Sequence, residues 1–168
     1  MPTPTAEQLI AQYALTPHPE GGYYKEFYRS NIALPASSLP ACFGGERSAS
    51  TAIYFLLQQG DFSAFHRIKS DEVWHFYVGD TLLLHILHTD GQLETVHLGN
   101  GVSTEHMYTA VVPAGAWFAS EPAPNAAFSF VGCTVAPGFD FADFEMADAT
   151  ELCNQYPQHA PFILPRCR

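Results

Sequence analysis

The sequence predicts an all-β fold, a barrel or a sandwich, with a short helix near each end of the chain. Two observations carry this prediction. The first is a high aromatic content, with 13 Phe, 8 Tyr and 2 Trp among 168 residues, a residue type favoured in strands. The second is a series of short apolar segments separated by turn signals, at residues 51–58, 62–68, 73–78, 80–88, 93–98, 107–112, 115–120 and 126–135. Many short strands at even spacing are typical of sandwiches and barrels.

Both predicted helices begin at a capping signal. Thr5 followed by Gln8 has the form of a capping box, and apolar residues at helical spacing come directly after it. Asp148 followed by Glu151 has the same form. We therefore expect an N-terminal helix and a short C-terminal helix over residues 149–155.

Loops and turns are marked by proline and glycine. Two prolines and two glycines in residues 17–22 predict a loop of defined shape. Residues 23–28 have the pattern of a strand, and residues 33–47 that of a long loop. Asp90-Gly91 predicts a type I′ hairpin turn, in which both central residues have positive φ.

The chain is expected to form one domain over residues 1–168, because it contains no internal repeat, linker or low-complexity segment. Its four cysteines, Cys42, Cys133, Cys153 and Cys167, lack the spacing of a metal knuckle or redox motif. No signal peptide and no 18-residue apolar run is apparent. These features predict reduced thiols and a cytoplasmic protein.

The charge balance excludes several kinds of partner. The net charge of −10, from 17 acidic and 7 basic residues, repels phosphate backbones and anionic membrane surfaces. We therefore expect no nucleic acid and no membrane partner. Five of the bases lie within the first 69 residues, so a local basic patch for an anionic substrate group remains open.

Residues 60–79 carry the most informative motif. They resemble the first cupin motif, G-x5-H-x-H-x3-4-E-x6-G, with Gly60, His66, Glu72 and Gly79 in place and Ile68 where the second histidine would stand. Residues 113–118 resemble the core of the second motif, P-x-G-x-x-H, with phenylalanine in place of the histidine. The residue due to be the leading glycine of that motif is a methionine, at position 107.

Further stretches resemble an uncharacterised, single-domain branch of the cupin superfamily. They are residues 18–24, 71–75 and 134–141, and the resemblance spans residues 5–146. It implies a double-stranded β-helix, or jelly roll, that is commonly dimeric, but no activity. Within the superfamily this branch looks most similar to the dTDP-4-keto-6-deoxyhexose 3,5-epimerases, which are metal-free and use a barrel histidine as base.

The residues at the metal-ligand positions of the two motifs determine whether a bound metal is expected. In a typical cupin the histidines and glutamate of both motifs bind a divalent transition metal. Here only His66 and Glu72 remain, since Ile68 and Phe118 can donate nothing. We expect no cofactor; the alternative is a divalent transition metal held by His66 and Glu72. His75 is a poor replacement ligand, because alternation along a strand puts it on the face opposite Glu72.

His66 and Glu72 are the candidate catalytic residues. A histidine and a carboxylate that face one cavity can act without metal as a general base and the group that orients it. Side-chain parity groups His66 with Ile68, and the six-residue separation predicts that Glu72 lies on a neighbouring strand. Candidate ligand-binding residues, mostly aromatic, are Tyr54, Phe65, Arg67, Trp74, His75, Trp117 and Phe118.

Three functions stay open at this point. The first is a metal-independent sugar or keto-sugar isomerase or epimerase with His66 as base, in which Arg67 or Arg29 meets a phosphate. The second is a metal-dependent cupin enzyme with a reduced ligand set. The third is a non-catalytic small-molecule binder. In each case the partner is a small molecule, such as a carbohydrate, and we expect a homodimer formed by an apolar outer face around Val73 and Tyr77.

Overall fold

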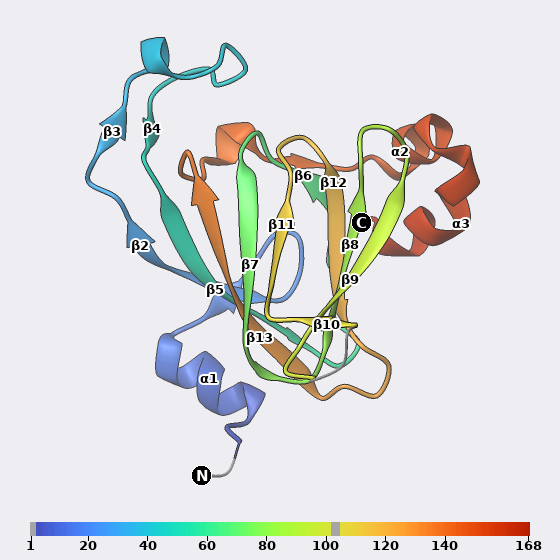
Figure 1. The fold of residues 1–168 in the computed structure, drawn as a ribbon. Helices are drawn as coiled ribbons and strands as arrows, with labels where there is room; N and C mark the ends of the chain where they lie inside the picture. The colour runs from blue at the N-terminus through green and yellow to red at the C-terminus, as the bar shows by residue number, and fades with distance from the viewer. Residues whose placement is uncertain (1–2, 102–104) are drawn as a thin grey trace.

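The computed structural model describes residues 3–101 and 105–168 and contains two six-stranded sheets that face each other (Figure 1). In order across the first sheet lie β1 (Thr16–Pro17), β2 (Tyr23–Arg29), β5 (Thr51–Gln58), β13 (Phe128–Ala136), β7 (Asp71–Gly79) and β11 (Thr109–Val112). In order across the second lie β10 (His106–Met107), β9 (Leu93–Leu98), β8 (Leu82–Leu87), β12 (Trp117–Pro122), β6 (Ser63–Arg67) and β14 (Glu145–Met146). The all-β jelly roll predicted from the sequence is confirmed.

The remaining elements lie outside the two sheets. They are α1 (Ala6–Tyr13), β3 (Ala33–Leu34), η1 (Ala36–Ser38), β4 (Arg47–Ser48), η2 (Phe141–Asp143), α2 (Ala149–Gln155), η3 (Pro157–His159), α3 (Ala160–Ile163) and η4 (Leu164–Arg166). The predicted loop at residues 33–47 contains a two-stranded ribbon, β3 with β4, which projects from the barrel (Figure 1). None of the described helices has the length and apolarity needed to cross a membrane.

The predicted helix starts are confirmed. The backbone N–H of Gln8 donates to Thr5 Oγ1 at 3.3 Å, and the backbone N–H of Thr5 donates to Gln8 Oε1 at 2.9 Å. This reciprocal pair satisfies two of the N–H groups left open at the start of α1. At α2 the side chain of Asp148 accepts from the backbone N–H of Glu151 at 2.9 Å. The C-terminal helix has the predicted bounds, Ala149–Gln155.

The hairpin turn between β8 and β9 differs from the predicted type I′. Its hydrogen bond runs from the Gly91 N–H to the His88 carbonyl at 2.9 Å, so Thr89 and Asp90 are the central residues. Of these residues only Gly91, with a φ of 89°, has positive φ. The turn is therefore of type I followed by a glycine bulge, the usual form of a three-residue hairpin loop.

Alternating burial along the strands divides the apolar residues among three cores. In β7 the side chains of Glu72, Trp74 and Phe76 are buried, while those of Val73 and His75 are only partly so, as parity predicts. The core between the sheets contains Phe55, Trp74, Leu84, Phe118 and Val131. A second core lies between the outer face of the second sheet and α2 and α3, and a third lies beneath α1.

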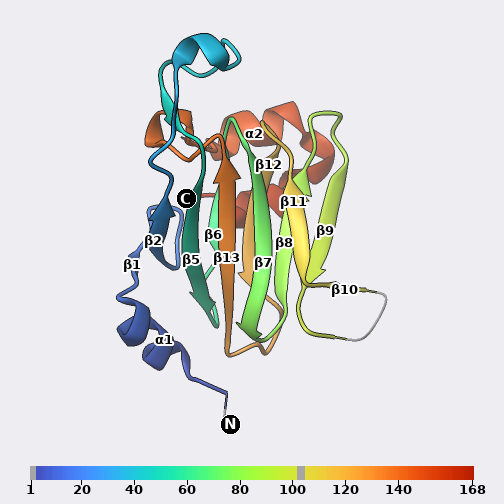
Figure 2. The ribbon, with the colours of Figure 1, turned by 60° about the vertical axis from the view of Figure 1, so that its left-hand side comes forward.

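The outer face of the first sheet is covered by α1 at one end only (Figure 2). Large apolar side chains stay exposed on the rest of it: Phe27 at 48%, Tyr77 at 46% and Val111 at 53%. Val111 pairs directly with Val73 across the strands, so the exposed residues are continuous with the face singled out in the sequence. Apolar patches on a sheet surface commonly mark a contact with another chain.

We propose that this face forms the contact of a homodimer. Light scattering at micromolar concentration should then give about twice the chain mass of 18.5 kDa. Replacing Tyr77 and Val111 together by lysine should shift the mass to that of one chain, because buried unpaired charges oppose association. A native protein that scatters as one chain would contradict the proposal.

Candidate functional site

A cavity of about 480 Å³ opens between the two sheets at one end of the barrel. Its walls come from the loop after β1, from β2, β5, β6, β7 and β13, and from residues 139–144. The side chains in it with acid, base or nucleophilic chemistry include His18, Glu20, Arg29, His66, Glu72 and Cys133. This volume is in the range of small-molecule sites in proteins.

The loop after β1 is folded tightly against the start of β6. The His18 N–H donates to the Gly22 carbonyl and the Gly21 N–H to the His18 carbonyl, each at 3.0 Å. Gly21 and Gly22 have φ values of 116° and 71°, which residues with a Cβ rarely adopt. The Ala64 N–H then donates to the Glu20 carbonyl at 2.9 Å. Glu20 is thereby fixed beside β6, within reach of His66.

Glu20 and His66 form a buried ion pair. His66 is 3% exposed and Glu20 6%. One ring nitrogen, Nδ1, donates to the Ala64 carbonyl at 2.7 Å, and Nε2 lies 3.0 Å from Glu20 Oε2. The Ala64 carbonyl can only accept, so Nδ1 carries a proton, and a raised pKa of His66 with a lowered pKa of Glu20 favours a second proton on Nε2, which makes His66 an imidazolium.

The protonation of this pair follows from its surroundings. Burial opposes the positive charge of His66, but the Glu20 carboxylate and its hydrogen bond, together with the Ala64 carbonyl and the Glu72 charge, outweigh burial and raise the pKa of His66. Burial likewise opposes the charge of Glu20, and the His66 charge and hydrogen bond, with smaller effects of His18 and Ser63, outweigh burial and lower the pKa of Glu20. The two ring nitrogens of His66 are therefore both occupied in the resting protein.

Glu72 has a different environment. It is 7% exposed and accepts no hydrogen bond from a nitrogen or oxygen of any described residue, although the Cys133 thiol lies beside it. Burial raises its pKa from an ordinary value of 4.5 to about 7; the Glu20 charge adds to this effect and the His66 charge opposes it. Near neutral pH Glu72 therefore exchanges between a carboxylic acid and a carboxylate, with its oxygens open to the cavity.

His66 and Glu72 line one cavity and lie on strands that follow each other in the chain, but these strands belong to different sheets. His66 is on β6 in the second sheet and Glu72 on β7 in the first, because the chain crosses between the sheets at residues 68–70. The two side chains therefore approach from opposite walls. This crossing explains why the hydrogen-bond partner of His66 is Glu20 rather than Glu72.

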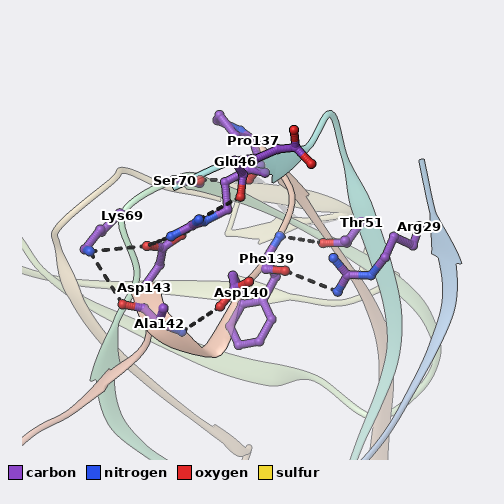
Figure 3. Close-up of polar contacts among 11 residues, drawn as sticks. Arg29, Glu46, Thr51, Lys69, Ser70, Pro137, Phe139, Asp140, Ala142 and Asp143 are labelled. Carbon is purple, nitrogen blue, oxygen red and sulfur yellow. Dashed lines mark hydrogen bonds and ion pairs between the residues drawn. The ribbon is translucent and has the colours of Figure 1, made fainter. Parts of the chain in front are cut away.

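Residues 137–144, which we call the strap, form another wall. Asp143 in the strap is bound by Arg47 through two hydrogen bonds of 2.6 and 2.7 Å and by Lys69 at 3.2 Å (Figure 3). The Phe139 N–H donates to Thr51 Oγ1 at 2.9 Å, and the Phe139 carbonyl accepts from Arg29 at 3.2 Å. The strap in turn places three phenylalanine rings against the cavity, those of Phe139, Phe141 and Phe144.

Most of the predicted ligand-binding residues lie elsewhere. Phe65 and Trp117 face away from the cavity, into the core beneath the C-terminal helices, because each neighbours an inward residue in a strand. Arg67 shares their face, where its guanidinium lies 4.4 Å from the Trp117 ring centroid and binds Glu145. Tyr54 lies on the outer face of the first sheet, against Phe27.

The other three predicted ligand-binding residues also lie outside the cavity wall; they are Trp74, Phe118 and His75. Trp74 and Phe118 do point between the sheets, but they fill the core below the cavity. Phe118 pairs with His66 across the strands, and the two ring centroids are 4.0 Å apart. His75 faces outward, with Nε2 at 3.4 Å from Thr134 Oγ1. A phosphate contact by Arg67 is therefore wrong for this cavity, whereas Arg29 does line it.

Several residues that line the cavity were not among the site residues predicted from the sequence. They are His18 and Glu20 in the first loop, Cys133 on β13, and the phenylalanines of the strap. The signal for the loop was its two glycines after two prolines, which require a specific backbone path. Phe139 and Phe141 lie within the third stretch that resembles the family, residues 134–141, and Phe144 lies beyond it.

The residues around His66 do not fit a cupin metal site. The second histidine of the first motif is Ile68, which lines the cavity, and that of the second motif is the buried Phe118. Both nitrogens of His66 already have protein partners. Among residues 3–101 and 105–168 no group of three or more His, Cys, Asp or Glu side chains is arranged to hold a metal ion.

The fold is a jelly roll with a cavity that opens between the two sheets. The chain belongs to the cupin superfamily, in the family described as Cupin superfamily (DUF985), whose model matches residues 7–147. The uncharacterized protein YML079W of Saccharomyces cerevisiae is 30% identical over 154 residues, which cover 85% of this chain and 76% of the yeast protein.

Solved structures agree with this membership. A hypothetical protein from Leishmania major is 36% identical, with a TM-score of 0.89 over 98% of this chain and 99% of its own. Protein SO0799 from Shewanella oneidensis is also 36% identical, with a TM-score of 0.87 over 100% and 99%. Oxalate decarboxylase from Bacillus subtilis, 13% identical with a TM-score of 0.54 over 90% of this chain and 37% of its own, shares the fold.

The raised pKa of Glu72 predicts how a variant changes stability with pH. Between pH 4.5 and about 7 the unfolded chain has released the Glu72 proton while the native state still holds it. Native stability therefore falls as pH rises through this range. Relative to Glu72→Gln, which does not titrate, the native protein should lose on the order of 3 kcal/mol of unfolding free energy.

Urea denaturation of both proteins at several values between pH 4.5 and 8 measures this difference. The unfolding free energy of the variant, relative to that of the native protein, should increase as pH rises and become constant above pH 8. A difference between the two proteins that does not change with pH would show that Glu72 titrates normally.

Proposed function

We propose that the protein is a metal-independent isomerase or epimerase that moves a proton next to the carbonyl of a small polar molecule, such as a keto sugar. The observation that carries the proposal is the pairing of a buried, open carboxyl group, Glu72, with a fixed positive charge on His66 in one cavity. A general base works best when its pKa lies near the working pH, and that of Glu72 is about 7.

The proton-transfer step uses these two residues in separate roles. The Glu72 carboxylate removes the proton from the carbon beside the carbonyl, and the electron pair of that C–H bond moves onto the carbonyl oxygen. The His66 imidazolium offsets part of the negative charge that develops there through its field alone, because the Ala64 carbonyl and Glu20 already engage both of its N–H groups. Glu72, now a carboxylic acid, then returns the proton to the enolate, and the carbonyl re-forms. Protonation on the opposite face of the same carbon gives the epimer, whereas protonation of the former carbonyl carbon, with the neighbouring hydroxyl losing its proton to the enolate oxygen, gives the isomer.

This allocation differs from the one expected from the sequence, in which His66 is the base and Glu72 orients it. Both nitrogens of His66 donate to fixed partners, so the residue has no free lone pair for a substrate proton. Glu72 accepts no N–H or O–H from a described residue, and the hydrogen-bond partner beside it is the weakly donating Cys133 thiol. Glu20 takes the orienting role, because it holds the ring of His66 and keeps it charged.

Exchange of carbon-bound protons with solvent tests the proposal. The protein is incubated in D₂O with dihydroxyacetone, L-erythrulose or D-fructose, and NMR follows deuterium incorporation beside the carbonyl. We expect exchange above the rate without protein, with a rate that rises through about pH 7 as Glu72 ionises. Glu72→Gln should lower the rate by about 10²–10⁴-fold, the usual contribution of a general base.

Glu145→Gln is the matched control, since Glu145 is a carboxylate on the exposed surface and should leave the exchange rate unchanged. An exchange rate in Glu72→Gln equal to that of the native protein would show that Glu72 is not the general base. Binding of these compounds without any exchange would favour the non-catalytic binder instead.

A further inference from the structure

We infer that His18 is the hydrogen-bond donor that holds the substrate's oxygen in this cavity, and that the substrate is uncharged. The inference rests on the proposed function for the location of the reacting carbonyl. It adds a binding residue that no motif indicates, and it narrows the class of substrate to carbonyl compounds without a phosphate or carboxylate group.

The hydrogen bonds of His18 leave one donor open. Its Nδ1 lies 3.3 Å from the Glu20 backbone nitrogen and 3.5 Å from Glu20 Oε2. In the neutral ring Nδ1 accepts from the Glu20 backbone N–H, and the proton of the ring is on Nε2. The side chain is 6% exposed, lines the cavity, and makes no described contact through Nε2.

A neutral ring suits this role. Burial lowers the pKa of His18, against the opposing effect of the Glu20 charge, and the His66 charge lowers it further. A neutral imidazole that donates one hydrogen bond can polarise a carbonyl without giving up its proton. His18 is held in place by edge-on contact with Tyr24, at 4.4 Å between ring centroids.

The charges of the cavity disfavour an anionic substrate. Glu20, Glu26, Glu72 and Asp140 line it, against one arginine, Arg29. That arginine already binds both oxygens of Glu26, at 2.9 and 2.7 Å, and His66 is taken by Glu20. A buried phosphate or carboxylate needs cationic partners that are free to bind it. No described lysine or further arginine lines this cavity.

Two variants separate the binding role from a structural one. In His18→Asn the amide oxygen can take the place of Nδ1 and accept from the Glu20 N–H, but the Nε2 donor is lost. In His18→Gln the amide N–H₂ can reach the position of Nε2, while the bond to the Glu20 backbone is lost. Binding of dihydroxyacetone, L-erythrulose and D-fructose is measured by NMR titration of the native protein and both variants.

We expect at least one uncharged compound to bind, with affinity at least tenfold weaker in His18→Asn and within about threefold of native in His18→Gln. The matching phosphate esters, such as D-fructose 6-phosphate, should bind at least tenfold more weakly than the uncharged forms. Sorbitol, which lacks the carbonyl, should bind His18→Asn and the native protein equally.

The inference is overturned if no uncharged compound binds, if a phosphate ester binds more tightly, or if His18→Asn binds as the native protein does. A loss in His18→Gln alone would show a structural role instead. Because the readout is equilibrium binding, these outcomes are independent of proton exchange. Binding that follows the expected pattern without any exchange in the native protein would leave this inference standing and contradict the proposed function.

Discussion

The buried contact between Glu20 and His66 connects the first loop of the chain to the second sheet and fixes the charge of the cavity. Two charges removed from water stabilise each other only when their geometry is held. Here the Ala64 carbonyl accepts from His66 Nδ1, and the Ala64 N–H donates to the backbone carbonyl of Glu20, so both partners are positioned by one residue. Loss of one partner from such a pair typically costs about 3–5 kcal/mol. The same pair sets the field at Glu72, since Glu20 raises and His66 lowers the pKa of that residue.

The barrel divides its interior between packing and chemistry. Trp74 and Phe118 fill the space between the sheets on one side of His66, while Ile68 and the phenylalanines of the strap leave a cavity on the other. Arg47 and Lys69 hold the strap through Asp143, far along the chain from either residue. The site therefore depends on three segments, the first loop, the inner strands and the strap, that only the folded chain brings together.

The sequence predicted the strands, both helix starts and the inward direction of His66, Ile68 and Glu72, because these follow from local patterns and strand parity. Parity alone also turns Phe65 and Arg67 outward, since both are next to His66. The same rule that predicted the direction of His66 could therefore have excluded these two residues from the predicted cavity lining. Glu20 was not predictable in this way. Its position depends on a loop that crosses to another strand, and no periodicity reports such a contact.

The central claim is that Glu72 is a buried proton carrier tuned by the Glu20–His66 pair, and a ¹³C NMR titration of the glutamate side-chain carboxyls tests it most directly. Comparison with Glu72→Gln assigns the signal. Our account predicts that this carboxyl titrates with a pKa of about 7. A Glu72 signal that titrates near the ordinary glutamate value of about 4.3 would contradict it.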